Sequence, residues 1–340
     1  MILNREPCPE LIWFATNRCN LNCTYCCNND ALDNLDELST EQARELIAQV
    51  ADFSKYFVII GGEPLLREDI FELFDYAHTL ELHCSIITKG TGMKEIWAEE
   101  MARKNVLVNI ALDALSSDIC DTLSRKEGTC DKAKEAIETC LKAGILQGIT
   151  CTLTKANAEE TFEIMNFAAE LGVEGCWMSL RPQGRGMEVY RELALIGHKY
   201  EEYLHNFYCK AREINKKTGL NFYVYDPLYC RILSQYGEQT SRICGMGRYL
   251  NVKANGDVIV CLFADFKVGN IREKTLKEIW SEVVSNRFFY EIHDPKNLKG
   301  ACGECSYNYI CGGCRVRAYQ LTGDWFASDP VCYLAQHVST

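Results

Sequence analysis

Three cysteines near the beginning of the chain have a spacing that can hold a metal centre. Cys19, Cys23 and Cys26 form a C-x3-C-x2-C loop. Zinc sites usually combine two C-x2–4-C pairs into four ligands, whereas this loop offers a compact set of three. Three thiolates on a four-iron cube leave one iron open to a substrate or cofactor. The loop therefore favours an open-sited [4Fe-4S] cluster over a buried or zinc-bound loop. Cys27 is expected to be no ligand, because adjacent side chains point apart.

A second group of cysteines lies in the carboxyl-terminal third. It comprises Cys244, Cys261, Cys302, Cys305, Cys311, Cys314 and Cys332. On spacing alone, its C-x2-C pairs are also typical of zinc knuckles. The remaining cysteines are scattered and are mostly expected to be small buried hydrophobes: Cys8, Cys27, Cys84, Cys120, Cys130, Cys140, Cys151, Cys176, Cys209 and Cys230.

Short apolar runs alternate with amphipathic stretches through the first half of the chain, as in a parallel sheet covered by helices. We predict strands at Glu10–Thr16, Tyr56–Ile60, Cys84–Thr88, Val106–Leu112, Gly148–Leu153 and Gly175–Leu180. We predict helices at Thr40–Phe53, Asp69–Leu80, Glu95–Lys104, Thr129–Ala143 and Asn157–Leu171. Six strand–helix units make about three quarters of an eight-unit barrel, whose chemistry lies at the carboxyl ends of its strands.

The pattern of predicted secondary structure changes twice after these six strand–helix units. Residues 1–186 are predicted to form an α/β fold, a partial (βα)6 TIM-like barrel. Residues 187–228 are predicted to form a helical connector, and residues 229–340 a small cysteine-rich α+β domain. In that domain, Tyr249–Lys253 and Val258–Leu262 flank Asn255-Gly256, which predicts a hairpin.

The composition narrows the classes of partner. The chain has 340 residues, 47% of them hydrophobic, and a formal net charge of −11. This charge argues against a nucleic-acid backbone as the main partner. No apolar stretch is long enough for a membrane span, and the amino terminus has no export signal. We therefore expect a soluble, cytoplasmic protein without disulfides that acts on small molecules or peptides.

A glycine pair and a carboxylate follow the second predicted strand, in Gly61, Gly62, Glu63 and Pro64. Paired glycines let backbone approach a ligand closely, and a carboxylate there can accept hydrogen bonds from an ammonium group. Taken alone, these four residues would most often form an ordinary turn.

Together, these motifs resemble those of radical S-adenosylmethionine enzymes. The resemblance rests on the cysteine loop, with Tyr25 before its third cysteine, and on Gly61 to Pro64, which resemble the motif that holds the methionine amino group. Thr88-Lys89-Gly90 resembles the family's Thr-Asn-Gly segment, although Lys89 departs from it. The resemblance implies that S-adenosylmethionine chelates the open iron, and that one electron cleaves it to methionine and a 5′-deoxyadenosyl radical.

The resemblance also implies further cofactor contacts. Asp113 and Arg125 occupy places where related enzymes contact the ribose or the methionine carboxylate, and Ser179 and Arg181 are weaker candidates of the same kind. For each charged group the alternative is an ordinary solvated charge. No catalytic acid or base is predicted.

The distal cysteines resemble the SPASM extension, most strongly at Cys311-Gly312-Gly313-Cys314-Arg315. This implies two auxiliary iron–sulfur clusters. By the family pattern, Cys302, Cys305, Cys311 and Cys332 would hold the outer cluster, and Cys244, Cys261 and Cys314 the inner one. The fourth inner ligand stays open between Cys230, a carboxylate, water and substrate.

The resemblance implies hydrogen abstraction from an unreactive carbon. Our leading prediction is crosslinking or oxidation of a ribosomally made peptide, with a separate leader-binding protein as partner. The alternative is tetrapyrrole side-chain modification in an alternative haem or haem d1 pathway, which the tail motif also resembles. An electron donor such as flavodoxin or ferredoxin and an oxygen-poor environment are expected in both cases. A non-enzymatic iron–sulfur or zinc protein is the outside alternative.

Overall fold

The sheet predicted for the first half of the chain is present. The computed structural model describes residues 10–28, 36–240 and 244–336, so Cys8 lies outside the described residues. In these ranges the sheet has ten strands in the order β10-β9-β8-β1-β2-β3-β4-β5-β6-β7. The six predicted strands are β1 (Glu10–Phe14), β2 (Tyr56–Ile60), β3 (His83–Thr88), β4 (Leu107–Ala111), β5 (Leu146–Leu153) and β6 (Glu174–Ser179). Each pairs in parallel with the next, which confirms the α/β fold.

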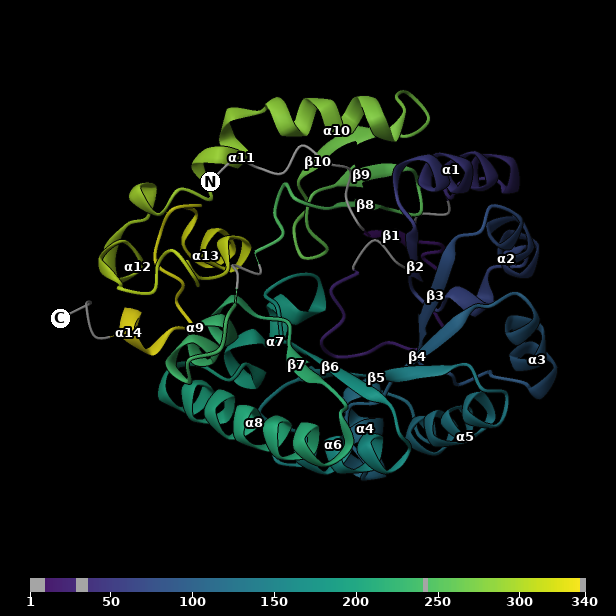
Figure 1. Cartoon of the computed structure of the whole chain (residues 1–340), viewed down its shortest axis with the longest axis horizontal. Helices are drawn as coiled ribbons and strands as arrows, with labels where there is room; N and C mark the ends of the chain where they lie inside the picture. Colours follow the sequence, from purple (N-terminus) through teal and green to yellow (C-terminus); the bar gives the residue numbers. More distant parts are fainter. Residues whose placement is uncertain (1–9, 29–35, 241–243, 337–340) are drawn as a thin grey trace.

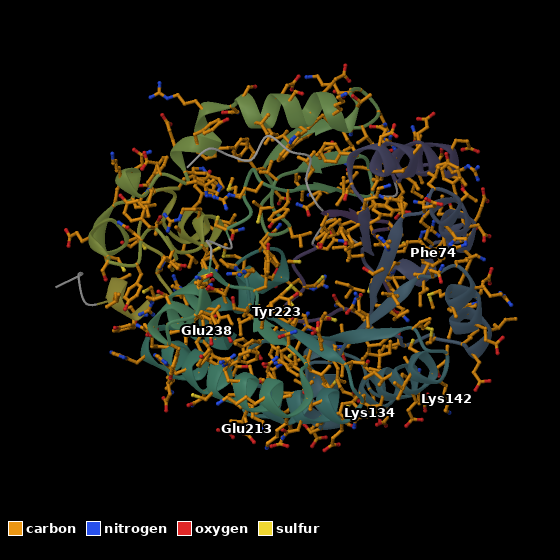
Figure 2. All side chains as sticks on the ribbon, viewed as in Figure 1. Phe74, Lys134, Lys142, Glu213, Tyr223 and Glu238 are labelled. Atoms are coloured by element: carbon orange, nitrogen blue, oxygen red, sulfur yellow. The ribbon has the colours of Figure 1, made fainter. Side chains whose placement is uncertain are left out.

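Helices cover the outer face of the curved sheet (Figure 1). They are α1 (Thr40–Phe53), α2 (Ile70–Thr79), α3 (Glu95–Arg103), α5 (Thr129–Lys142) and α6 (Glu160–Glu170), all predicted, and α4 (Ser117–Ser124), which was not. Helix α1 begins at a capping box, in which the Ser39 side chain accepts a hydrogen bond from the Gln42 amide. Lys134, Lys142 and Glu213 lie on the outer side of the helices (Figure 2).

The predicted hairpin extends the barrel sheet. Strands β8 (Leu250–Val252) and β9 (Asp257–Ile259) pair antiparallel as predicted. Strand β8 also pairs in parallel with β1, and β10 (Lys267–Asn270) pairs with β9. The strand that leads into the first cysteine loop is thus bonded directly to the region that carries the distal cysteines.

The predicted connector contains more than helices. Helices α7 (Arg185–Leu193) and α8 (Gly197–Thr218) are followed by β7 (Phe222–Val224), which extends the sheet beyond β6. Gly219 ends α8 in the left-handed conformation, with φ of 78°. Helix α9 (Pro227–Gln235) comes next. The division of the chain at residues 186 and 228 stays a prediction.

The carboxyl-terminal region consists of short helices and loops. Its helices are α10 (Leu276–Ser285), α11 (Arg287–Glu291), α12 (Gly300–Glu304), α13 (Arg315–Thr322) and α14 (Tyr333–Gln336). Phe266, Phe288 and Trp325 pack against one another beside them. Among the helices described, none has the length and apolar character required to cross a bilayer.

Candidate active site and cluster-binding loops

The first cysteine loop leaves β1 and is fastened to the end of β2. The Gly62 amide donates to the Thr16 carbonyl at 2.8 Å, and the Glu63 amide donates to the Arg18 carbonyl at 2.8 Å. A Cβ atom on Gly61 would lie 2.6 Å from the Thr16 oxygen, and one on Gly62 would lie 2.2 Å from the Arg18 oxygen. The glycine pair therefore permits a close approach of backbone, as predicted, but the neighbour is the cysteine loop itself.

Other elements hold the remainder of this loop. The Thr24 amide donates to the Leu123 carbonyl at the end of α4, at 2.8 Å. The Lys126 ammonium donates to the Asn20 carbonyl at 3.1 Å. The Arg185 guanidinium donates to the Cys23 carbonyl at 2.8 Å. The loop that carries Cys19, Cys23 and Cys26 is thus fixed from three sides.

Glu63 lies buried next to the end of β3. Its carboxylate accepts hydrogen bonds from the Thr88 hydroxyl at 2.7 Å, the Lys89 amide at 3.1 Å and the Leu65 amide at 3.2 Å. Burial raises the pKa of Glu63, while these three donors oppose the shift. Glu63 and Thr88 were both predicted from sequence, and the structure brings them into contact. Pro64 begins the 3-10 turn that follows, Pro64–Leu66.

A second buried carboxylate, Asp113, follows β4. It accepts a hydrogen bond from the Lys89 ammonium at 2.5 Å, from the Thr152 amide at 2.9 Å and from the Tyr25 hydroxyl. Burial and the neighbouring Asp113 charge raise the pKa of Tyr25 well above its ordinary value, so the phenol stays protonated. The residue that departs from the family motif, Lys89, is therefore the cation that neutralises Asp113.

Three predicted contact residues lie elsewhere. Arg125 ends α4 in the left-handed conformation, and its side chain is exposed. The Ser179 hydroxyl and the Arg181 guanidinium both donate to Asp226, at 2.6 and 3.0 Å. In the structure these two groups therefore bind Asp226, a partner that the sequence did not suggest. Contacts of the three residues with S-adenosylmethionine stay predictions.

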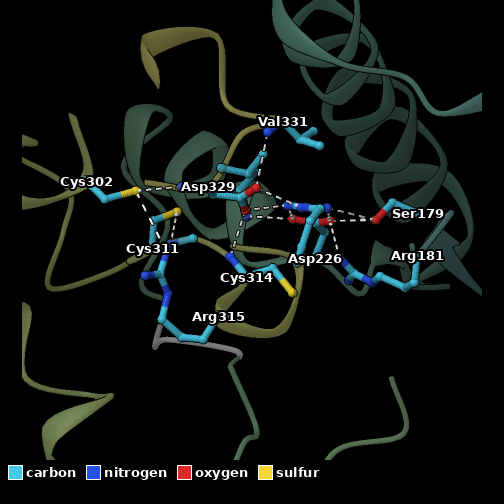
Figure 3. Close-up of polar contacts among 12 residues, drawn as sticks. Ser179, Arg181, Asp226, Cys302, Cys311, Cys314, Arg315, Asp329 and Val331 are labelled. Carbon is cyan, nitrogen blue, oxygen red and sulfur yellow. Dashed lines mark hydrogen bonds and ion pairs between the residues drawn. The ribbon is translucent and has the colours of Figure 1, made fainter. Parts of the chain in front are cut away.

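Asp226 belongs to a buried ionic network that joins the barrel to the distal cysteines (Figure 3). Arg317 on α13 donates to Asp226 at 2.8 Å and to Asp329 at 2.6 Å. Asp329 in turn accepts a hydrogen bond from the Cys314 amide at 2.7 Å. Arg181, from the end of β6, completes the network. No motif indicated it, because Asp226 is 45 positions from Arg181 and 91 positions from Arg317 in the chain.

The structure places the distal cysteines in two neighbourhoods, and their assignment to two clusters stays a prediction. A cavity is lined by Cys302, Cys305, Cys311 and Cys332, the set predicted for the outer cluster, together with Arg231. Cys261 lies in electrostatic contact with Cys314, Cys244 and Arg181, and the Tyr225 ring lies beside Cys261 and Cys244. Tyr225 is therefore a protic group near the inner set that sequence reasoning missed.

The hydrogen bonds of the predicted ligands fit iron–sulfur ligation. Backbone amides two residues further along donate to the sulfur atoms of Cys19, Cys305 and Cys311, at 3.4, 3.4 and 3.3 Å. At Cys19 and Cys311, these bonds stabilise thiolate over thiol and so oppose the rise in pKa that burial causes. For Cys84 and Cys140, in contrast, burial alone raises the pKa to about 12. The donor sets suit bound clusters, whereas Cys84 and Cys140 are core residues.

A cavity of about 190 Å³ lies between the first cysteine loop and the hairpin region. Cys27, Asn28, Gln183 and Lys253 are among its lining residues. The Asn28 side-chain nitrogen and the Gln183 side-chain oxygen are buried and have no hydrogen-bond partner among the described residues. Unsatisfied buried amides are costly, so the cavity suits a ligand with polar groups. Burial raises the pKa of Cys27 to about 12, and its role as a non-ligand stays a prediction.

A partial parallel barrel with a three-cysteine loop after its first strand defines a class of enzyme, and family comparisons agree. The Radical SAM superfamily model matches residues 13–178, and the SPASM iron–sulfur cluster-binding domain matches residues 244–306. The chain belongs to the radical SAM superfamily and is an enzyme of its SPASM-containing subset. Membership implies a [4Fe-4S] cluster, S-adenosylmethionine and auxiliary iron–sulfur clusters.

Similar proteins extend over nearly the whole chain. It is 32% identical to the AdoMet-dependent heme synthase of Methanosarcina barkeri, over 95% of this chain and 96% of the relative. It is 30% identical to the pre-heme d1 synthase of Dinoroseobacter shibae, over 98% and 88%. It is 29% identical to the mycofactocin maturase MftC of Mycolicibacterium smegmatis, over 95% and 82%. The structure of anSMEcpe with bound AdoMet superimposes with a TM-score of 0.72 at 21% identity, over 96% of this chain and 93% of that one.

Proposed function

We propose that the chain modifies a tetrapyrrole side chain by hydrogen abstraction. The observation that carries this proposal is the end-to-end similarity to an AdoMet-dependent heme synthase, which is 32% identical over 95% of the chain. It favours the alternative reading of the sequence over the leading one. The net change expected for a propionate is loss of one hydrogen atom, one electron and CO2, which leaves a vinyl group.

We propose specific roles for the residues of the site. Cys19, Cys23 and Cys26 bind the cluster, and Glu63 accepts hydrogen bonds from the S-adenosylmethionine ammonium group. When bound, the [4Fe-4S] cluster and S-adenosylmethionine supply the 5′-deoxyadenosyl radical, and the auxiliary clusters serve as electron acceptors. Thr88 and the Lys89 amide orient Glu63, because both donate to its carboxylate. Lys89 and Tyr25 hold Asp113 in place, because both donate to its carboxylate.

The distal cysteines are proposed to divide between the auxiliary clusters as the family pattern implies. The substrate side chain is proposed to enter the cavity that Asn28, Gln183 and Lys253 line, since this cavity lies between the two cysteine-bearing regions. The Lys253 ammonium contacts Asp265 at 2.7 Å. We propose that a carboxylate of the substrate replaces Asp265, whose side chain is exposed, as the partner of Lys253.

Replacing Glu63 by glutamine is expected to weaken S-adenosylmethionine binding. Loss of one charge-assisted hydrogen bond costs about 1.5–3 kcal/mol, or roughly 10- to 150-fold in affinity. Equilibrium binding to the reconstituted protein measures this change. The control is Glu68→Gln, because the Glu68 side chain is exposed and lies nearby in the same segment. If E63Q and wild type bound S-adenosylmethionine with equal affinity, Glu63 would not be a cofactor-binding residue.

The proposed reaction is tested with iron-coproporphyrin III as the probe. Reconstituted, reduced protein with S-adenosylmethionine is expected to convert propionate groups to vinyl groups, which mass spectrometry detects together with stoichiometric 5′-deoxyadenosine. If 5′-deoxyadenosine forms but the porphyrin mass does not change, the tetrapyrrole proposal is wrong and the enzyme class stands.

Modification of a ribosomally made peptide is the second candidate. It is favoured by the 29% identity to a mycofactocin maturase over 95% of the chain. A precursor peptide, supplied with a separate leader-binding protein, is the second arm of the same experiment. In either case we propose flavodoxin or ferredoxin as electron donor and an oxygen-poor cytoplasm as location, because exposed iron and free thiols require protection.

A further inference from the structure

Arg315 is a buried cation without a carboxylate partner in the described part of the chain. It begins α13, directly after Cys314, and its side chain is fully buried. One guanidinium nitrogen donates to the carbonyls of Trp325 and Ala327, at 3.1 and 2.8 Å. The Nε atom has no hydrogen-bond partner. The hydrogen bonds of this charge therefore go only to neutral acceptors, and Asp324 interacts with it electrostatically without an ion-pair contact.

Other buried arginines of the described chain are neutralised. Arg317 pairs with Asp226 and Asp329, Arg181 pairs with Asp226, and Arg231 pairs with Glu201. The acidic groups nearest Arg315 are already engaged, because Asp324 binds Lys299 at 2.6 Å and Asp329 binds Arg317. A buried unpaired charge costs several kcal/mol, so a native structure is expected to provide a counter-charge.

The free side of Arg315 faces the outer cysteine set. Its Nη2 atom lies 4.0 Å from the Cys302 sulfur (Figure 3). A Cβ atom placed on Gly313 would lie 2.8 Å from Nη2, so this glycine leaves the guanidinium room beside the loop. Cys302 and Gly313 both line the cavity that the four outer cysteines share. Arg231, which is paired with Glu201, lines that cavity, whereas Arg315 lies beside it and reaches the set through Cys302.

We propose that Arg315 is the counter-charge and N–H donor of the outer auxiliary cluster and raises its reduction potential. Four thiolates leave such a cluster with net negative charge, and a fixed cation with hydrogen bonds to sulfur favours the reduced form. This inference rests on the proposed assignment of Cys302, Cys305, Cys311 and Cys332. It makes Arg315 a positioning and tuning residue that does not touch the substrate.

The test is a redox titration followed by electron paramagnetic resonance. In reconstituted Arg315→Gln protein, the outer cluster is expected to have a more negative midpoint potential, with the inner-cluster potential unchanged. Arg315→Lys keeps the charge and is expected to shift the potential less. The matched control is Arg272→Gln, because Arg272 forms a surface ion pair with Asp36. An outer-cluster potential equal to wild type in R315Q would overturn the proposal.

Two further outcomes are decisive. If R315Q loses the outer cluster while R315K retains it, the counter-charge role is supported; if both lose it equally, charge is not what Arg315 supplies. Cys305→Ala identifies the outer signal, and an unchanged iron content in C305A would contradict the ligand assignment and this inference with it. None of these measurements needs a substrate, so failure of the tetrapyrrole reaction leaves them unaffected.

Discussion

Replacing Cys23 by alanine is expected to abolish S-adenosylmethionine cleavage and to remove about four iron atoms per chain, the content of one cubic cluster. Two thiolates cannot hold the cluster in the site that the loop defines. The loop itself is expected to keep its shape, because the Cys23 carbonyl, rather than its sulfur, accepts the hydrogen bond from Arg185. Iron analysis and 5′-deoxyadenosine release measure the two effects.

Cys209→Ala is the matched control for this variant. Cys209 is exposed on α8, outside both predicted ligand sets. It is expected to retain wild-type iron content and cleavage. If C23A released as much 5′-deoxyadenosine as C209A, the first loop would not be the site of radical generation.

Replacing Asp226 by asparagine is expected to destabilise the protein by about 3–5 kcal/mol, the typical cost of breaking a buried ion pair on one side. Asp226 is fully buried and binds both Arg181 and Arg317. Its loss leaves Arg181 without a carboxylate partner. Because Arg317 also holds Asp329, which accepts the Cys314 amide, weaker retention of the auxiliary clusters is expected as well. Chemical denaturation and iron analysis measure these changes.

The pH dependence of this effect has a definite sign. Burial acts to raise the pKa of Asp226, but Arg317 and Arg181 outweigh it and lower the pKa well below its usual range. A depressed folded-state pKa gives stability that is present above the unfolded value, about 3.9, and is lost as the pH falls further. The stability gap between wild type and D226N should therefore be full at neutral pH and narrow below about pH 4. Asp36→Asn, at an exposed pair with Arg272, should show only a small loss, and a D226N loss as small as that would contradict the structural role of the network.

Elements with a strong local signal were predictable from sequence. Strand β2 and helix α1 match their predicted bounds, because β2 is a continuous run of hydrophobic residues and α1 has a clear cap and an amphipathic face. Strand β7 was not predicted, since three residues are too few for an alternating pattern. The parallel pairing of β8 with β1 also cannot be predicted from local sequence, because it joins residues about 240 positions apart.

In the candidate site, too, some residues were predictable from local motifs and others became apparent only in the structure. The cysteines and Glu63 were predicted from spacing within short loops, and the structure places Glu63 against Thr88, a contact that the motifs did not specify. The charged partners of the site residues, in contrast, come from distant segments of the chain. Lys89 was noticed only as a departure, and its role becomes clear from its contact with Asp113. Arg315 belongs to the motif that runs from Cys311 to Arg315, but the lack of an ion-pair partner for its charge follows from packing alone.

The most direct test of the central claim is the cleavage of S-adenosylmethionine by the wild-type chain. After anaerobic reconstitution with iron and sulfide and then reduction, the protein is expected to release 5′-deoxyadenosine and methionine in equal amounts. Protein that has taken up its iron and is reduced, yet releases no 5′-deoxyadenosine, would contradict the assignment of radical chemistry to this site.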